Sequence, residues 1–259
     1  MDPTKTPLDF NTLRVRAKEL AISGKSLVLF GLSGAAVLQL DKVIIPLFIS
    51  PTALSPYFLA SALCLTPISV LAGPITQYFQ PRIIASISAG DLTSAQDNLR
   101  KLTLAIVYAV AIPSALLWLG RDFIINLWLN QDPIATEVTR YVEILLPGIA
   151  LGALGFVPYT VLVAHQDYRA QARLSATLTV VTLLATVAAS FMGSVLAICW
   201  VYAGYHSLST VVSWWRSMRL QPPAPNHYAS RAAGDALAML ASMAVLAAGL
   251  SLLPVLSFK

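Results

Sequence analysis

The sequence LSATLTVVTLLATVAASFM at residues 174–192, followed by Gly193 and then SVLAICWVYAGYHSLSTVVS at residues 194–213, decides the fold class. Neither block contains Asp, Glu, Lys or Arg. Each is about as long as the roughly 20 helical residues that cross about 30 Å of hydrocarbon. Both blocks are apolar nearly all round, as are helices surrounded by lipid or by other helices. They predict two consecutive transmembrane helices.

The rest of the chain repeats this pattern. Of its 259 residues, 57% are apolar and 11% are charged, and the mean hydropathy is +0.71. So little polar surface cannot cover a soluble globule of this length. Seven blocks can cross a bilayer, at residues 26–50, 53–79, 102–120, 137–164, 174–192, 194–213 and 236–256. The sequence therefore predicts an all-α membrane protein with about seven transmembrane helices.

The basic residues predict the orientation, because cytoplasmic loops accumulate Lys and Arg. They precede the first block and follow the second, fourth and sixth: Lys5, Arg14, Arg16, Lys18, Lys25, Arg82, Arg100, Lys101, Arg169, Arg173, Arg216, Arg219 and Arg231. The other loops hold Arg121 alone, and Lys259 ends the chain. This alternation places the amino terminus inside and the carboxyl terminus outside. The net charge of +5 follows from these anchoring cations, so we expect no nucleic-acid partner.

Aromatic residues mark the expected membrane boundaries, because Tyr and Trp prefer the membrane–water interface. We expect Tyr57, Trp118 and Trp128 at the outer boundary, and Tyr78, Tyr168, Trp214 and Trp215 at the inner one. Short loops without paired acids, a nucleophile beside a base, or a nucleotide-binding motif predict that the chain is not an enzyme. Its three scattered histidines predict no metal site, and no motif calls for a cofactor.

Four ionisable residues inside the spans carry the strongest functional signal, because each costs about 3 kcal/mol at mid-membrane and must face protein or water. Asp41 and Lys42 lie toward the outer end of the first span, and Arg140 and Glu143 enter the fourth from the same side. One hypothesis has them line a water-accessible cavity, paired as Asp41 with Arg140 and Lys42 with Glu143, or with the cations free for an anionic substrate. The alternative is a structural ion-pair cluster.

Weaker candidates for the cavity are Gln39, two residues before Asp41, and His206 in the sixth span. We expect a neighbouring helix to satisfy His206, and the alternative is a role in proton transfer. Proline lies inside several spans, at Pro46, Pro67, Pro74, Pro113, Pro147 and Pro158, where it can bend a helix. The spacing of Gly148 and Gly152 predicts the close approach of a neighbouring helix.

Two stretches of the chain resemble a known family. The run Ser33-Gly-Ala-Ala-Val-Leu-Gln-Leu-Asp-Lys-Val-Ile-Ile45 and the run Pro51-Thr-Ala-Leu-Ser-Pro-Tyr-Phe-Leu-Ala60 resemble polysaccharide-export and O-antigen flippases of the multidrug/oligosaccharidyl-lipid/polysaccharide superfamily. Residues 144–169 and 191–197 look like the carboxyl-terminal lobe of the same proteins. The resemblance covers residues 20–216, and Asp41-Lys42 matches the family motif.

The resemblance implies two six-helix lobes around a central cavity in the bacterial inner membrane, which moves an undecaprenyl-diphosphate-linked oligosaccharide to the outer leaflet. Cations such as Lys42 and Arg140 would suit the diphosphate. Membrane lipids would be the other partners. Within that scheme, residues 1–25 are a cytoplasmic segment, 26–216 a six-helix lobe, 217–235 a Pro-rich cytoplasmic linker and 236–259 an additional transmembrane helix.

Only one lobe of such a flippase is represented. Three explanations stay open: a truncated reading frame, a split transporter whose amino-terminal lobe is a separate chain, or a lobe that dimerises with a second copy of itself. Two other functions are alternatives. One is a non-transporting scaffold of a polysaccharide-assembly complex, and the other is a drug/cation antiporter of the same superfamily, in which Asp41 would titrate.

Overall fold

The computed structural model describes residues 10–130, 133–220, 231–238 and 241, and these residues form helices joined by short turns, without strands. Five described helices are long and apolar enough to cross a membrane: Pro51–Ser88, Leu92–Leu119, Ile134–Ala164, Tyr168–Phe191 and Val195–Arg219. Val28–Val37 and Gln39–Leu47, which meet at a bend of 43°, add a sixth if they count as one span. The predicted all-α, multi-pass membrane class is confirmed.

The chain builds these spans from the following elements. The first is α1 (Phe10–Ile44), which the short helix η1 (Ile45–Leu47) extends. The second is α2 (Pro51–Pro67), η2 (Ile68–Ala72) and α3 (Gly73–Ser88); the third is α4 (Leu92–Ile106), η3 (Val107–Ala111) and α5 (Ile112–Leu119). Then come α6 (Arg121–Trp128), α7 (Ile134–Ala153), α8 (Phe156–Ala164), α9 (Tyr168–Phe191) and α10 (Val195–Arg219).

The observed spans contain or closely match the six predicted blocks up to residue 213, and several run further because polar residues extend the helices past the apolar core. The predicted segment 1–25 is helical from Phe10 and continuous with the first span. Most of the seventh block, residues 236–256, lies outside the described residues. The count of seven and the inside–outside orientation stay predictions.

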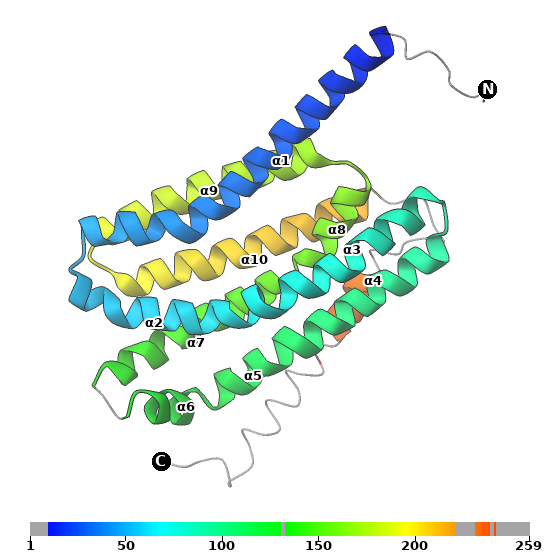
Figure 1. The fold of residues 1–259 in the computed structure, drawn as a ribbon. Coiled ribbons are helices and arrows are strands. Elements are labelled where there is room, and N and C mark those ends of the chain that lie inside the picture. The colour runs from blue at the N-terminus through cyan, green and yellow to red at the C-terminus, as the bar shows by residue number, and fades with distance from the viewer. Residues whose placement is uncertain (1–9, 131–132, 221–230, 239–240, 242–259) are drawn as a thin grey trace, which may run out of the picture.

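Successive spans run in opposite directions (Figure 1). The turn after α1, the short helix α6 and the turn between α9 and α10 lie at one end, which we call the α6 end. The turns between α3 and α4 and between α8 and α9 lie at the other, the α3–α4 end, beyond which the start of α1 projects. Helix α1 packs along α9, and α7 packs on both α2 and α10. The basic loops predicted to be cytoplasmic are thus gathered at the α3–α4 end.

Local sequence explains where several helices begin. The Ser50 hydroxyl accepts a hydrogen bond from the backbone N–H of Ala53, and Pro51 occupies the first turn of α2, where its missing N–H costs nothing. The Asp91 carboxylate caps α4 in the same way after the turn at Gly90, whose φ of +74° favours glycine. These caps satisfy helix ends that would otherwise expose unpaired amides.

Glycines set the distance between α7 and α10. A Cβ atom on Gly148 would lie 2.5 Å from the Ala203 Cα, and one on Gly152 would lie 2.8 Å from the His206 Nδ1. Atoms this close would overlap, so the backbones of the two helices meet at Gly148, and the His206 side chain packs directly on the α7 backbone at Gly152. The predicted close approach at Gly148 and Gly152 is confirmed, and α10 is the neighbour.

Candidate functional site

Asp41 is the most deeply buried carboxylate among the described residues, with 3% of its surface exposed. It lies in the last turn of α1, where its Oδ1 accepts a hydrogen bond from the Lys42 backbone N–H at 2.7 Å. Its Oδ2 accepts a hydrogen bond from the Tyr57 hydroxyl at 3.2 Å. Burying a carboxylate is costly unless it is hydrogen-bonded, so the Tyr57 phenol stabilises α1 against α2.

Tyr202 of α10 lies beside Tyr57 and contacts α1 one turn before Asp41. Its hydroxyl donates a hydrogen bond of 2.9 Å to the carbonyl oxygen of Val37, one helical turn before Asp41. Its ring lies 6.4 Å from the ring of Tyr57, centroid to centroid. Asp41, Tyr57 and Tyr202, which we call the aspartate–phenol cluster, thus tie α1, α2 and α10 together. Tyr57 is only 1% exposed, so its ring packs inside the bundle; its expected depth at the outer membrane boundary stays a prediction.

Lys42 points away from this cluster although it follows Asp41 in the chain. Its side chain is exposed, and its Nζ donates a hydrogen bond of 3.2 Å to the Gln39 Oε1 on the same helix. Adjacent residues on a helix differ by about 100° in direction, so one can be buried while the next faces outward. Gln39 and Lys42 therefore present a polar pair on the surface of α1.

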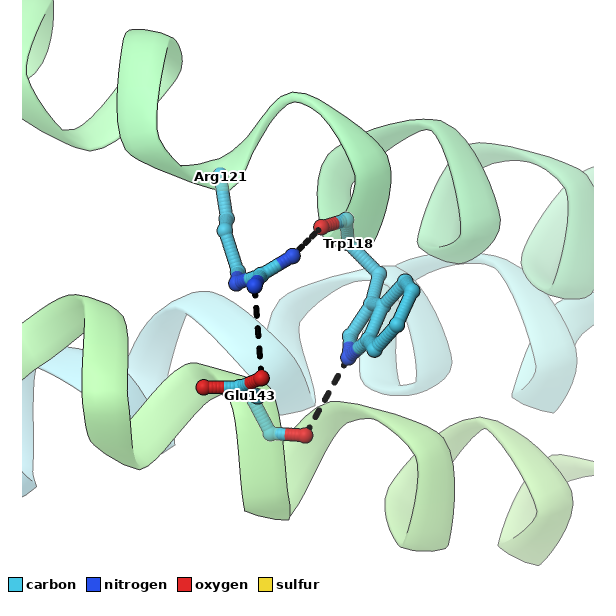
Figure 2. Close-up of polar contacts among 3 residues, drawn as sticks. All are labelled: Trp118, Arg121 and Glu143. Atoms are coloured by element: carbon cyan, nitrogen blue, oxygen red, sulfur yellow. Dashed lines mark hydrogen bonds and ion pairs between the residues drawn. The ribbon is translucent and has the colours of Figure 1, made fainter. Parts of the chain in front are cut away.

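Glu143 pairs with Arg121 and not with Lys42 (Figure 2). The Arg121 Nη2 lies 3.2 Å from the Glu143 Oε1, and its Nη1 donates a hydrogen bond of 2.7 Å to the Trp118 carbonyl. The Trp118 indole N–H donates to the Glu143 carbonyl oxygen at 3.2 Å, and the guanidinium lies 4.8 Å from the indole ring. Arg121 begins α6 and Glu143 lies within α7, so this tryptophan–arginine–glutamate cluster holds α6 against the bundle.

The two expected ion pairs are therefore wrong. Asp41 bonds to phenols and not to Arg140, and Glu143 bonds to Arg121 and not to Lys42. Arg140 is exposed and forms no salt bridge with any described residue. The reason is helix order: α1 packs mainly on α9, whereas α7 packs on α2 and α10, so other helices separate the two charged pairs.

The contacts that Arg121, Trp118, Tyr57 and Tyr202 make around the two carboxylates were not predicted from the sequence. Arg121 was expected in a loop. It follows Trp118 by three residues, and this spacing can bring a guanidinium onto an indole ring. Tyr57 follows Asp41 by 16 positions, on the other side of a short turn. Two antiparallel helices that are joined by a short turn pack side by side, so residues on either side of the turn can meet. Tyr202 offered no sequence signal, because it comes from a helix that is distant in the chain.

His206 lies in the contact between α7 and α10, where the absence of a side chain at Gly152 leaves space for its ring. Its Nε2 is buried and has no hydrogen-bond partner among the described residues, so the expectation of a neighbouring helix that satisfies this atom is not met there. No group of three His, Cys, Asp or Glu side chains suited to a metal occurs in the part of the chain that the structure describes.

Basic and aromatic side chains combine at the α3–α4 end. The Arg82 guanidinium lies 4.0 Å from the Tyr78 ring centroid, and that of Arg219 lies 3.8 Å from the Trp215 ring centroid. Tyr78 is 56% exposed and Trp215 is 49% exposed, as expected of residues that anchor a helix at a membrane surface. Arginines beside exposed aromatic rings are suited to contact with anionic lipid headgroups.

No protein-family model, curated protein or solved structure matches this chain.

Proposed function

We propose that this chain is one lobe of a transporter that moves an undecaprenyl-diphosphate-linked oligosaccharide from the inner to the outer leaflet of the bacterial inner membrane. The flippase resemblance at Asp41-Lys42 motivates the proposal. The observation that carries it is that the two adjacent side chains lie on different sides of α1. The Asp41 carboxylate is buried inside the bundle, and the Lys42 amine is exposed on its surface.

The exposed Lys42 amine supplies what a diphosphate needs. A lysine within a membrane span is costly in lipid, so it favours a position beside an anion or water. Its Nζ donates a hydrogen bond to the neutral Gln39 and forms no salt bridge with a described residue. The amine and the amide together offer a charged and a neutral donor to phosphate oxygens. Lys42 therefore binds the diphosphate in this proposal.

Asp41 has a positioning role. Its hydrogen bond with Tyr57 fixes the last turn of α1 against α2, and Lys42 is the next residue along that turn. Neutralising Asp41 would loosen this turn and so displace the amine. The substrate path lies between this lobe and a second one, either a separate amino-terminal lobe or a second copy of the chain. The basic α3–α4 end faces the cytoplasm.

Complementation tests the proposal. The chain is expressed in cells that lack their own O-antigen flippase, alone and with a separately encoded first lobe, and surface glycan is scored. Lys42→Gln should abolish export while Lys42→Arg retains it, because both Lys and Arg carry the required charge. Lys25→Gln, an exposed change earlier on α1, is the matched control. Full export by Lys42→Gln at normal membrane levels would refute the diphosphate role. Absence of rescue by the unsubstituted chain in both arms, despite its insertion into the membrane, would favour the scaffold function.

The buried carboxylate favours a second candidate, a drug/cation antiporter. Asp41 is a buried carboxylate next to the neutral phenols of Tyr57 and Tyr202. A carboxylate in such a place within a membrane bundle can bind a proton or a cation. In that case Asp41→Asn should abolish drug resistance conferred by the chain, and Lys42→Gln should leave it intact. The two variants thus separate the two transport functions.

A further inference from the structure

Three neighbouring spans are interrupted at one level of the bundle. The second and third contain π-helical segments, η2 (Ile68–Ala72) and η3 (Val107–Ala111). The fourth is broken between the end of α7 at Ala153 and the start of α8 at Phe156. Segment η2 contacts η3, and both contact α7, so the three interruptions are adjacent in space.

A proline accounts for each interruption. Pro74, Pro113 and Pro158 lack the backbone N–H that would bond to the carbonyl four residues earlier. Those carbonyls belong to Val70 in η2, Ala109 in η3 and Leu154 in the break. At the break, Leu154 instead accepts a bond from the Val157 N–H at 3.3 Å. π-helical turns and proline are recognised causes of helix bending, and π-turns often mark functional sites.

The hydrophobic core divides at the same level. One cluster of buried side chains joins α1, α2, α7 and α10 toward the α6 end and includes Tyr57 and Tyr202. The other joins η2, α3, α4, η3, the end of α7 and α8 toward the α3–α4 end, and Trp214 of α10 packs against it. Side chains within a cluster are close-packed against one another and make fewer contacts with the other cluster. Each half of the bundle is therefore a packing unit of its own, and Ile68, at the start of η2, touches both.

The second packing unit also holds residues 231–238. Ala232 is part of its buried cluster. The Arg231 Nη1 donates a hydrogen bond of 3.0 Å to the Gln96 Oε1, and the Arg100 Nε lies 3.4 Å from the Asp235 Oδ2. Helices α9 and α10, in contrast, run 24 and 25 residues without interruption. They span both halves and can serve as a fixed frame.

We propose that η2, η3 and the Leu154–Gly155 break form one hinge, about which α3, α4, α8 and residues 231–238 pivot against α9 and α10. The pivot opens and closes the α3–α4 end while the aspartate–phenol cluster at the α6 end stays assembled. Helix kinks sharper than about 20° occur mainly at such sites, and a change of this angle over the roughly 24 Å length of α3 would move the end of the helix by about 8 Å. The hinge does not depend on the identity of any substrate.

Spin-label distance measurements on the full chain in lipid nanodiscs test the hinge. The background carries Cys64→Ala and Cys199→Ala. One label pair, at Thr93 on α4 and Thr177 on α9, spans the moving and fixed parts. The control pair, at Thr52 on α2 and Met192 after α9, stays within the α6 end. All four label sites are exposed.

The 93–177 pair should show two distance populations separated by roughly 8 Å, the displacement that a 20° kink in α3 predicts. The 52–192 pair should show one. The triple variant Pro74→Ala, Pro113→Ala and Pro158→Ala restores the missing donors and should collapse the 93–177 distribution to one population. Equally narrow distributions for both pairs in the unsubstituted chain would overturn the hinge. So would a two-population distribution that the triple variant leaves unchanged.

Discussion

Replacing Gly148 by alanine should separate α7 from α10. The new Cβ atom would lie 2.5 Å from the Ala203 Cα and 2.7 Å from both its Cβ and its carbonyl oxygen. Carbon atoms pack best at about 3.5–4.0 Å, so the helices must move apart by about 1 Å or more. Overpacking of this kind costs about 1–3 kcal/mol. The better helix propensity of alanine returns about 0.5–1 kcal/mol, which leaves a net loss centred on about 1 kcal/mol and at most about 2.5 kcal/mol.

Gly204→Ala is the matched control, because Gly204 lies on α10 beside Ala203 and a Cβ there would meet no atom within 4 Å. Reversible unfolding in mixed micelles with a rising fraction of denaturing detergent, followed by circular dichroism, measures both variants. Gly148→Ala should unfold at a lower detergent fraction than the unsubstituted protein, and Gly204→Ala at an equal or higher one. Equal midpoints for the two variants would show that α7 and α10 do not approach so closely.

Three further predictions use other parts of the structure. Hydrogen bonds at the start of α4 lower the pKa of Asp91. The stability that the ionised Asp91 gives the folded protein is therefore fully present above the ordinary aspartate pKa of about 3.9, and it is lost as the pH falls through the lowered pKa. Asp91→Ala should therefore reduce stability at pH 7 and match the unsubstituted protein in strong acid, and a deficit that persists in acid would contradict this sign. A double-mutant cycle on Arg121→Gln and Glu143→Gln should give a coupling of about 0.5 kcal/mol, because Glu143 is 48% exposed and solvent screens the pair. A coupling above about 2 kcal/mol would mean that the pair is buried. Cys64 and Cys199 are 1% and 0% exposed, so maleimide should modify neither until denaturant is added, and rapid labelling of either would contradict its burial.

Much of the helical framework was predictable because it rests on local patterns. The block predicted at residues 137–164 is the span Ile134–Ala164, and the turn expected at Gly193 separates α9 from α10. The spacing of Gly148 and Gly152 indicated a close contact, since small residues one turn apart always share a helix face. Composition, block length and local spacing carry this information without any knowledge of neighbouring helices.

The candidate site was only partly predictable. Asp41 and Glu143 were recognised as costly intramembrane charges, but their partners, Tyr57 and Arg121, were not. Charge complementarity alone favoured Arg140 for Asp41, whereas the helix order brings a neutral phenol to it. The prolines were recognised as bends, yet their alignment into one level across three spans depends on which helices are neighbours.

The sequence by itself determined that the chain is helical, that it belongs in a membrane and where most of its spans begin and end, because burial of apolar length and the satisfaction of backbone amides in lipid are local requirements. Only the tertiary structure decided which face of each span is buried and which charges meet. Spans that are apolar nearly all round carry almost no signal for their own rotation. Their orientation is set by close packing, as at Gly148 and Ala203, and by single hydrogen bonds between distant segments, as between Tyr202 and Val37.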